Sequence, residues 1–253
     1  MDYLILALFE VMGTSILTIG LNFGYKKGPD CVSSGLFVAI LLTKRVTGSH
    51  LNAGITIGVG IVEKATEDKK KMLIGLTYIL AQLLGGYIGM AISYLILDDA
   101  SMNMSPGLNN DNLLYLSFVE FIFSWIFITI YLYAKCDWVA PSQDFGLRAF
   151  TMMGVYYACI SMVQRITGGA LNPTIGFCAP TFHAAFVSGD ASNLKYVVAY
   201  MIGPILSGVL AGLFLRFFAI KHTPQSNTIH GSPFLANKMR RTVSEQSKSP
   251  NSN

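Results

Sequence analysis

The chain has 253 residues, of which 52% are hydrophobic and only 13% are charged, and its mean hydropathy is +0.50. Ordinary soluble proteins carry roughly 25% charged residues, so this composition argues against a soluble enzyme, a nucleic-acid-binding protein and a disordered scaffold. The formal net charge of +4 comes from loops and from the C-terminal region. We therefore expect an integral membrane protein with lipid around it and no nucleic-acid partner.

Six apolar tracts, taken in chain order, are candidates to cross a bilayer as helices. They cover residues 3–25, 31–43, 72–97, 112–134, 149–164 and 196–215. A spanning helix needs about 20 residues, so the second and fifth tracts must include flanking residues. Two further neutral pieces, residues 51–62 and 166–182, are too short or too interrupted by Gly and Pro to be spans and are typical of re-entrant segments. The sequence predicts an all-α integral membrane protein with six transmembrane helices and two re-entrant half-helices.

The basic residues indicate on which side of the membrane each loop lies. With both termini cytoplasmic, every Lys and Arg is cytoplasmic except Lys26, Lys27, Arg165 and Lys195, in agreement with the positive-inside rule. Glu10 lies inside the first apolar tract, which argues against a cleaved signal peptide. The tract lengths do not distinguish the plasma membrane from an intracellular membrane.

The C-terminal region, residues 220–253, is rich in Ser, Asn and Pro and lacks helical periodicity. This composition predicts a disordered cytoplasmic tail. Its segment 240–244, Arg-Arg-Thr-Val-Ser, resembles a basic-directed kinase site with Ser244 as a possible phosphorylation acceptor. The alternative is that the arginines only hold the tail near anionic lipid.

The chain contains an internal repeat. Residues 47–55 read Thr-Gly-Ser-His-Leu-Asn-Ala-Gly-Ile, and residues 167–175 read Thr-Gly-Gly-Ala-Leu-Asn-Pro-Thr-Ile. Thr, Gly, Leu, Asn and Ile recur at the same places. The two halves, about residues 3–97 and 112–219, each hold three spans and one re-entrant segment. Because three is odd, the halves must be inverted relative to each other, which brings both Asn segments to the membrane midplane.

Two Asn motifs give the chain a specific resemblance to a known family. They are Asn52-Ala53-Gly54 and Asn172-Pro173-Thr174. Together they resemble the paired motifs of the aquaporin, or major intrinsic protein, family, over about residues 3–219. The resemblance implies one channel domain over residues 1–219, in which two half-helices meet at their N-termini in the middle of the membrane. It also implies one pore per protomer and a homotetramer.

Each Asn heads a predicted half-helix. Its side-chain oxygen can cap backbone N–H groups while its NH2 group turns into the pore. Two such donors, backed by two positive helix-dipole ends, would orient a passing water molecule and repel cations and protons. The family motif is Asn-Pro-Ala, but proline at the first helical position is not required, so Ala53 is acceptable, and Gly54 is expected to loosen the first turn. The alternative is that Asn52 and Asn172 are helix caps without solute contact.

Two carboxylates lie within the predicted spans, Glu10 in the first and Glu120 in the fourth. The resemblance implies that both accept hydrogen bonds from backbone N–H groups of the re-entrant loops. A proton relay, as in a secondary transporter, is the alternative. His50, two residues before the first Asn, matches the family's His-Leu-Asn segment and is expected to shape the cytoplasmic mouth, unless it is a loop residue bonded only to backbone.

The largest departure from the family concerns the outer filter. Water-selective members and glycerol channels usually place an arginine three residues after the second Asn, but this chain has Ile175. The spacing of the other filter positions selects Val32, Ile160 and Gly169, with Ser34 in place of Val32 if the alignment contains a two-residue gap. Such a filter offers neither charge nor aromatic ring. Losing the arginine could slow water by dewetting, or could lower the resistance to larger neutral solutes.

We therefore predict a passive channel for water and other small uncharged solutes such as glycerol, urea, ammonia or peroxide. Gly176 stands where the glycerol-channel branch usually has Asp, so a dedicated glycerol facilitator is not supported. No phosphate-binding Gly loop, metal cluster or catalytic triad is present in the sequence, so we expect no enzyme and no cofactor. The alternatives are an ion- or proton-coupled carrier that uses the buried Glu residues, and a non-conducting scaffold relative. Cys31, Cys136, Cys159 and Cys178 are expected to be packing residues.

Overall fold

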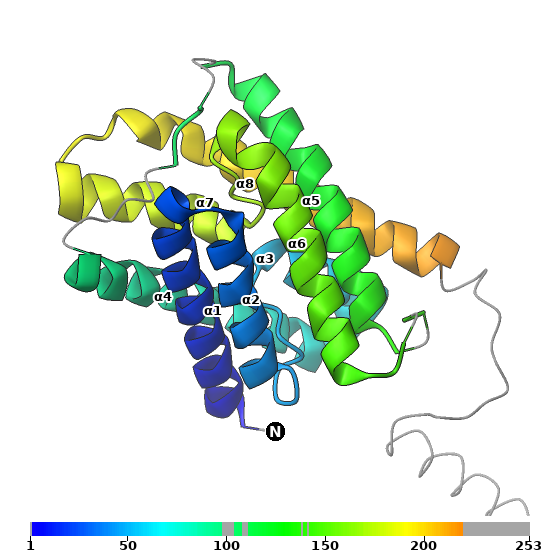
Figure 1. Cartoon of the computed structure of the whole chain (residues 1–253). Coiled ribbons are helices and arrows are strands. Elements are labelled where there is room, and N and C mark those ends of the chain that lie inside the picture. The colour runs from blue at the N-terminus through cyan, green and yellow to red at the C-terminus, as the bar shows by residue number, and fades with distance from the viewer. Residues whose placement is uncertain (1, 98–103, 108–110, 138, 141, 220–253) are drawn as a thin grey trace, which may run out of the picture. The chain divides into compact units, whose positions relative to one another are not determined.

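Figure 1 shows the computed structural model of the chain. It describes residues 2–97, 104–107, 111–137, 139–140 and 142–219, without the side chain of Lys26. The regular structure of these residues is helical throughout. The tail predicted for residues 220–253, with Ser244, lies outside the described residues.

The first half contains two long helices, one shorter helix and one half-helix. They are α1 (Tyr3–Lys27), α2 (Pro29–Thr43), α3 (Ala53–Val62) and α4 (Lys69–Leu97), with a 3-10 turn at Ala65–Glu67. Asp2 caps α1 by accepting a hydrogen bond from the N–H of Leu4 at 2.9 Å. Gly28 alone joins α1 to α2, and its φ of 136° lies in the region that favours glycine. Pro29 then begins α2 at the first helical position, where its missing N–H is not needed.

The second half repeats this order. Its elements are α5 (Leu113–Lys135), α6 (Phe145–Thr167), α7 (Pro173–Phe182) with a π-helical end at His183–Ser188, a 3-10 turn at Ser192–Tyr196, and α8 (Val197–Phe214) with a π-helical end at Leu215–Ala219. Asn112 caps α5 by accepting from the N–H groups of Leu114 and Tyr115. Asp144 caps α6 by accepting from the N–H of Leu147 at 2.7 Å. Polar residues between the apolar tracts therefore define where α1, α5 and α6 begin.

Among the described residues, five helical stretches are long and apolar enough to cross a membrane: α1, α4, α5, α6 and Ser192–Ala219, which includes α8. The sixth span, α2, has only 15 residues. Backbone hydrogen bonds from Thr47 N–H to Thr43 and from Gly48 N–H to Lys44 add a further turn to it. α3 and α7 have 10 residues each and are the two half-helices. The predicted all-α fold of six spans and two half-helices is confirmed.

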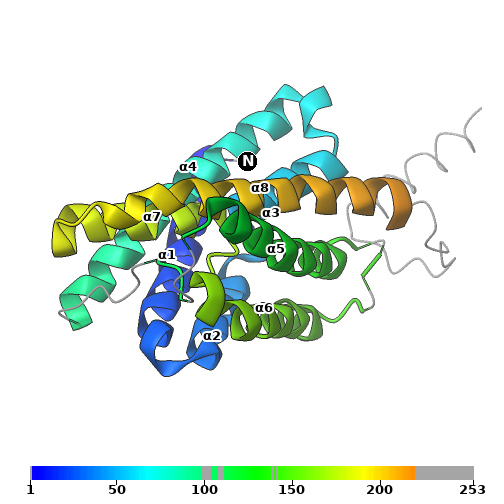
Figure 2. The same ribbon diagram turned by 90° about the horizontal axis from the view of Figure 1, so that it is seen from above.

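The half-helices pack across the repeat, as Figures 1 and 2 show: α3 lies against α8, and α7 lies against α4. Glycines allow the first of these contacts. A methyl group added at Gly208 would collide with the backbone of Gly54, and one added at Gly54 would lie 2.8 Å from the carbonyl oxygen of Pro204. Gly54 therefore has a packing role in addition to the expected effect on the first turn.

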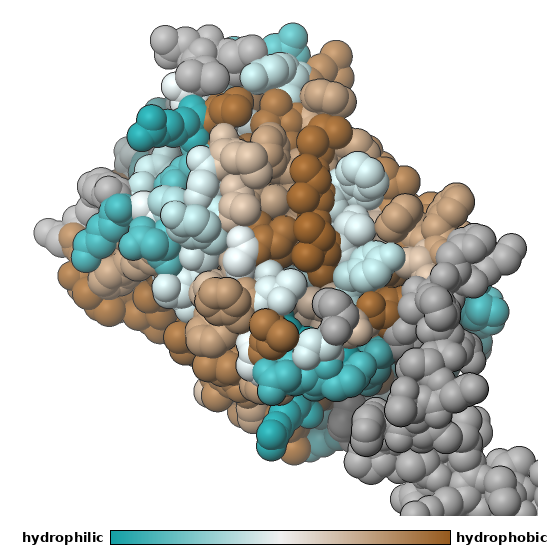
Figure 3. Space-filling view, turned by 45° about the vertical axis from the view of Figure 1, so that its right-hand side comes forward, coloured by the Kyte–Doolittle hydropathy of each residue, from teal (hydrophilic) through white to brown (hydrophobic). Residues whose placement is uncertain are grey.

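The outward faces of the spans are apolar. On α4, Leu76, Leu80 and Leu84 are 53%, 58% and 56% exposed and follow one another at a spacing of four residues. Figure 3 shows one face of the molecule, on which hydrophobic side chains cover the middle and hydrophilic ones gather toward the margins. Exposed apolar area of this extent is unfavourable in water and suits contact with lipid.

Candidate functional site

The N-termini of α3 and α7 meet through their two Asn residues. The Asn52 Nδ2 atom donates to the carbonyl oxygen of Leu171 at 2.9 Å, and the Asn172 Nδ2 atom donates to that of Leu51 at 2.9 Å. The Asn52 Oδ1 atom accepts from the N–H of Gly54 at 2.7 Å, and the Asn172 Oδ1 atom is likewise a cap. Each amide has two N–H groups, so one donor per Asn remains beyond this cross-link. The two Asn side chains thus both begin a half-helix and join the halves.

Glu10, fully buried in α1, supports the loop before α3. Its Oε1 accepts from the N–H of His50 at 3.0 Å, and its Oε2 accepts from the N–H of Leu51 at 2.8 Å. The Gln82 Nε2 atom of α4 also donates to Oε2, at 2.8 Å. These hydrogen bonds hold Leu51 at a φ of 54°, a left-handed conformation that is costly for a residue with a side chain.

Glu120, fully buried in α5, supports the loop before α7 in the same way. Its two oxygens accept from the N–H groups of Ala170 at 3.0 Å and Leu171 at 2.9 Å. The third donor is the Thr167 hydroxyl, at 2.5 Å. Leu171 has a φ of 47°, matching Leu51 in the first half. Both predicted carboxylates therefore contact the re-entrant loops.

His50 lies on the α3 side of the paired Asn residues and is 8% exposed. Its Nδ1 atom is 3.2 Å from the Thr56 hydroxyl, which donates to the Asn52 carbonyl and accepts from the Gln82 amide. Tyr78 packs edge-on against the imidazole at a centroid distance of 4.8 Å. The imidazole therefore bonds to a side chain, not to backbone.

Two tyrosines hold the re-entrant loops from the third spans. The Tyr78 hydroxyl donates to the Thr47 carbonyl at 3.2 Å, and the Tyr200 hydroxyl donates to the Thr167 carbonyl at 2.5 Å. Sequence reasoning missed this pair. A signal was present in the repeat. Tyr78 lies four residues before Gln82, and Tyr200 lies four residues before Pro204, the residue at the corresponding place in the second half.

The loop before α3 has two further anchors that sequence reasoning also missed. The Tyr131 hydroxyl of α5 donates to the Ser49 carbonyl at 2.5 Å, and the Lys135 ammonium, one turn further along, donates to the Gly48 carbonyl at 2.5 Å. The repeat could not predict them, because no matching pair is seen on the loop before α7 among the described residues. Their spacing of four places both on one face of α5.

The predicted filter residues are almost inaccessible: Val32 and Ile160 are each 1% exposed, and Ile175 is fully buried. Ile160 lies next to Gly169, where an added methyl group would be 3.1 Å from the Ile160 Cδ1 atom. Val32 packs against α1. Ser34, the alternative position, is exposed and donates its hydroxyl to the carbonyl of Asp30 in its own helix at 2.7 Å. Around Gly169, an added methyl group would meet the side chains of Ile160 and Val163 and the Gln164 Cα atom.

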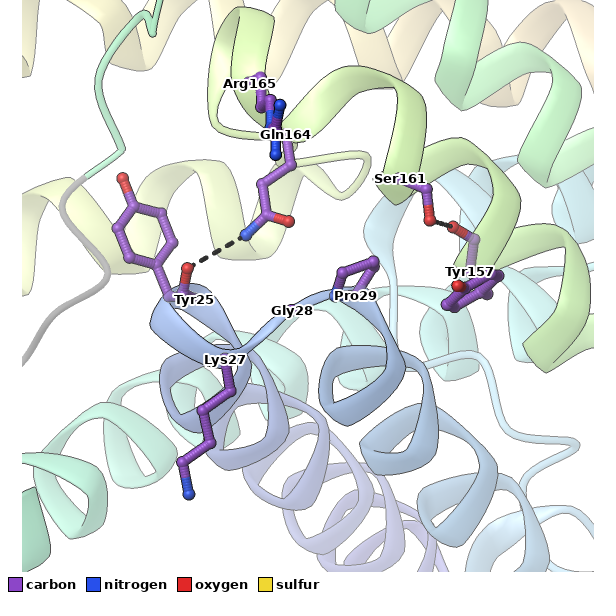
Figure 4. A pocket seen from close by; sticks show the side chains of 8 residues that line it. All are labelled: Tyr25, Lys27, Gly28, Pro29, Tyr157, Ser161, Gln164 and Arg165. Atoms are coloured by element: carbon purple, nitrogen blue, oxygen red, sulfur yellow. Dashed lines mark hydrogen bonds between the residues drawn. The ribbon is translucent and has the colours of Figure 1, made fainter.

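A cavity of about 710 Å³ lies beside the C-terminal end of α6, away from the Asn pair. It is lined by Tyr25, Lys27, Gly28, Pro29, Tyr157, Ser161, Gln164 and Arg165. Figure 4 shows the Gln164 side chain reaching from α6 to the carbonyl of Tyr25, a hydrogen bond of 3.3 Å that links α6 to the end of α1. Gln164 follows Ile160, a predicted filter residue, by one helical turn.

The four cysteines are free thiols, with Cys159 and Cys178 buried. Within the described ranges no three His, Cys, Asp or Glu residues are grouped so that they could hold a metal ion.

A comparison with protein families matches residues 11–215 to the family described as "Major intrinsic protein". The chain belongs to this family. The resemblance drawn from the paired Asn motifs is thereby confirmed.

Relatives within the major intrinsic protein family include plant proteins. The chain is 29% identical over 189 residues to "Probable aquaporin TIP2-2" of Oryza sativa subsp. japonica, with 74% of this chain and 69% of the relative covered. It is 28% identical over 185 residues to "Aquaporin TIP2-3" of Arabidopsis thaliana, with 70% and 66% covered. The matches thus span about two thirds of these relatives' length.

A solved structure shares the fold. The X-ray structure of the aquaglyceroporin from Plasmodium falciparum superposes with a TM-score of 0.71 at 21% identity and covers 86% of this chain and 97% of that chain. The agreement extends over both halves, since nearly all of that chain is matched.

Proposed function

We propose that this protein is a passive membrane channel for water and other small uncharged solutes, among them glycerol, urea, ammonia and peroxide. The observation that carries the proposal is the reciprocal pairing of Asn52 and Asn172 at the meeting point of the two half-helices. The names of its relatives, which are aquaporins, favour the same class of function.

The paired amides have a defined part in this mechanism. Each uses one N–H group on the opposite loop, and the other is a donor for the oxygen of a passing water or alcohol. The positive ends of the α3 and α7 dipoles lie behind these donors. A cation that left its hydration shell there would meet N–H groups in place of oxygen ligands, so neutral solutes pass and cations do not.

The outer filter sets which neutral solutes pass. Val32, Ile160, Gly169 and Ile175 are proposed to form it, and none of them offers a charge. A constriction without the arginine discriminates by size and dewetting and not by hydrogen bonding. The near-complete burial of these side chains means that they must move by a small amount when solute passes. This burial is also the observation that favours the second candidate, a channel relative that does not conduct.

A carrier driven by protons receives less support. Glu10 and Glu120 each accept three hydrogen bonds from groups of the same protein. These bonds tie both carboxylates to the re-entrant loops, so we propose that both are fixed supports of the loops. Cytoplasmic termini and a homotetramer in a lipid bilayer complete the proposal.

Stopped-flow light scattering on proteoliposomes tests the function. Shrinkage in an impermeant osmolyte measures water flow, and reswelling in glycerol or urea measures solute flow. Fast shrinkage supports the channel function, and the presence or absence of reswelling shows whether glycerol or urea also passes. Proteoliposomes that match empty vesicles in both measurements would support the non-conducting relative, and saturable solute flow coupled to proton movement would support a carrier.

A further inference from the structure

The two re-entrant loops differ in the charge that lies against them. On the loop before α3, the Lys135 ammonium sits 2.5 Å from the Gly48 carbonyl oxygen. Gly48 has a φ of 80°, and a methyl group added there would collide with this ammonium. The Lys135 nitrogen therefore occupies the space beside the backbone four residues before Asn52.

Burial opposes a positive charge on the Lys135 side chain, but two features of the fold favour that charge. Lys135 is the last residue of the 23-residue helix α5, and the carbonyl end of a helix is its negative pole. The Gly48 carbonyl adds a direct acceptor. Among the described residues Lys135 forms no ion pair, so a neighbouring carboxylate does not cancel its charge. Arg148, in contrast, is paired with Asp137 at 2.6 Å.

The charge of Lys135 reaches the α3 side of the paired amides. The ammonium lies beside the carbonyl of Gly48, which is two residues before His50 and four residues before Asn52 in the same loop. On the corresponding part of the second half, the neighbours of Gly168 are the Ser105 backbone and the Met104 methyl group. The position three residues after the second Asn is the apolar Ile175.

The geometry points to Lys135 as a specificity-determining residue that repels cations at the α3 mouth of the pore, in a channel whose outer filter has no arginine. This inference rests on the proposed channel function. A fixed ammonium in a region of low dielectric raises the energy of any cation that approaches it, whereas a neutral solute is unaffected. Alkali-metal ions and protonated amines are the excluded class, and water and uncharged amines are admitted.

The experiment measures cation and water permeability on the same proteoliposomes of the full chain. Lys135→Met removes the charge at nearly constant length, Lys135→Gln removes it but keeps an N–H donor, and Lys135→Arg keeps it. Lys71→Met, at an exposed lysine of α4 paired with Glu63, is the control for general loss of charge. Potassium and methylammonium fluxes are read with entrapped indicators and divided by the water permeability.

We expect the ratio of cation to water permeability to rise roughly tenfold or more for Lys135→Met and Lys135→Gln, and to stay at the wild-type value for Lys135→Arg and the control. Adding Ile175→Arg to Lys135→Met should lower the ratio again, because it returns a charge to the pore. If Lys135→Met does not fold, Lys135→Gln carries the test.

Different results would contradict the proposed channel function and the proposed role of Lys135. Wild-type protein that conducts neither water nor neutral solute would overturn the proposed channel. If the wild-type protein conducts water, and Lys135→Met and Lys135→Gln have the same ratio of cation to water permeability as Lys135→Arg, only the role of Lys135 is overturned.

Discussion

The loops before α3 and α7 are built on one plan but fastened with different strength. Both are held by a buried carboxylate, by a tyrosine from the third span and by an Asn cap. The loop before α3 is held in addition by the Tyr131 hydroxyl and the Lys135 ammonium of α5, and no matching pair is seen on the loop before α7 among the described residues. The loop before α7 lies instead among apolar neighbours such as Ile160 and Val163. The repeat thus fixes the backbone path, while side chains that do not repeat, such as Tyr131 and Lys135, make the two loops different.

The largest effect is expected from removing the carboxylates. Glu120→Ala leaves the buried N–H groups of Ala170 and Leu171 without acceptors, at about 1–3 kcal/mol each. Glu10→Ala does the same to its own loop, but Tyr131 and Lys135 still hold that loop. We therefore expect Glu120→Ala to abolish the monodisperse peak in size-exclusion chromatography and Glu10→Ala to reduce it. Equal losses would show that the α5 anchors add nothing.

The conservative variants Glu120→Gln and Glu10→Gln are the matched controls for this comparison. Each keeps one acceptor oxygen and nearly the same volume, so each should lie between wild type and its alanine variant. A glutamine variant as damaging as the alanine variant would mean that the negative charge itself is indispensable.

The next largest effect on stability is expected from Gly208 on α8 and Gly86 on α4, which occupy corresponding positions in the two halves. A methyl group added at Gly208 would collide with the backbone of Gly54. A methyl group added at Gly86 would instead lie 2.9 Å from the sulfur of the Cys178 side chain. Overpacking costs about 1–3 kcal/mol, and a side chain yields more readily than backbone. We expect Gly208→Ala to lower the melting temperature in detergent clearly more than Gly86→Ala; the reverse order would place the tighter contact at α7.

The pairing of the halves could be predicted from sequence because it rests on repeated residues. The two Asn motifs, spaced alike from the apolar tracts, were sufficient for the family, the inversion and the half-helices. The α5 anchors could not be predicted in this way. Lys135 reads from sequence as one more basic residue at the cytoplasmic end of a span, and only the fold brings it to Gly48.

Other parts of the site depended on contacts that sequence spacing does not encode. Thr56 is one turn into α3 and reads as an ordinary helical residue, yet its hydroxyl joins His50 to Gln82. The choice between Val32 and Ser34 depended on an alignment gap, and the fold buries one and exposes the other. Which of them meets solute stays a prediction.

A smaller effect, on selectivity and not on folding, is expected from Ile175→Arg. It would place a positive charge near the loop before α7, as Lys135 does beside the loop before α3. The larger, charged side chain should narrow the constriction and reduce glycerol and urea permeation more than water permeation. Ile175→Met, similar in volume and neutral, is the control and should leave the ratio near the wild-type value. Equal reductions of solute and water flow would show that residue 175 does not line the pore.

The smallest expected effect is a pH dependence of stability that arises from Lys44, near the loop before α3. Lys44, just after α2, has a buried ammonium without a hydrogen-bond partner among the described residues. Burial, followed by the positive charges of Lys135 and Arg148, lowers the pKa of Lys44 to about 7, while Asp137 acts in the opposite direction. An unfolded lysine has a pKa of about 10.4. Between these two values the folded state binds fewer protons, so this group makes stability rise with pH across that window and adds no pH dependence below it.

Lys44→Met should therefore be more stable than wild type at about pH 7, and this advantage should shrink toward about pH 10. Melting temperatures of the two proteins in detergent, measured across this range, give the difference directly, and titrations common to both cancel. A difference that is constant with pH would mean that Lys44 is solvated in the folded protein. A difference that shrinks would mean that burial, together with the positive charges of Lys135 and Arg148, disfavours the charged form of Lys44 in the folded protein.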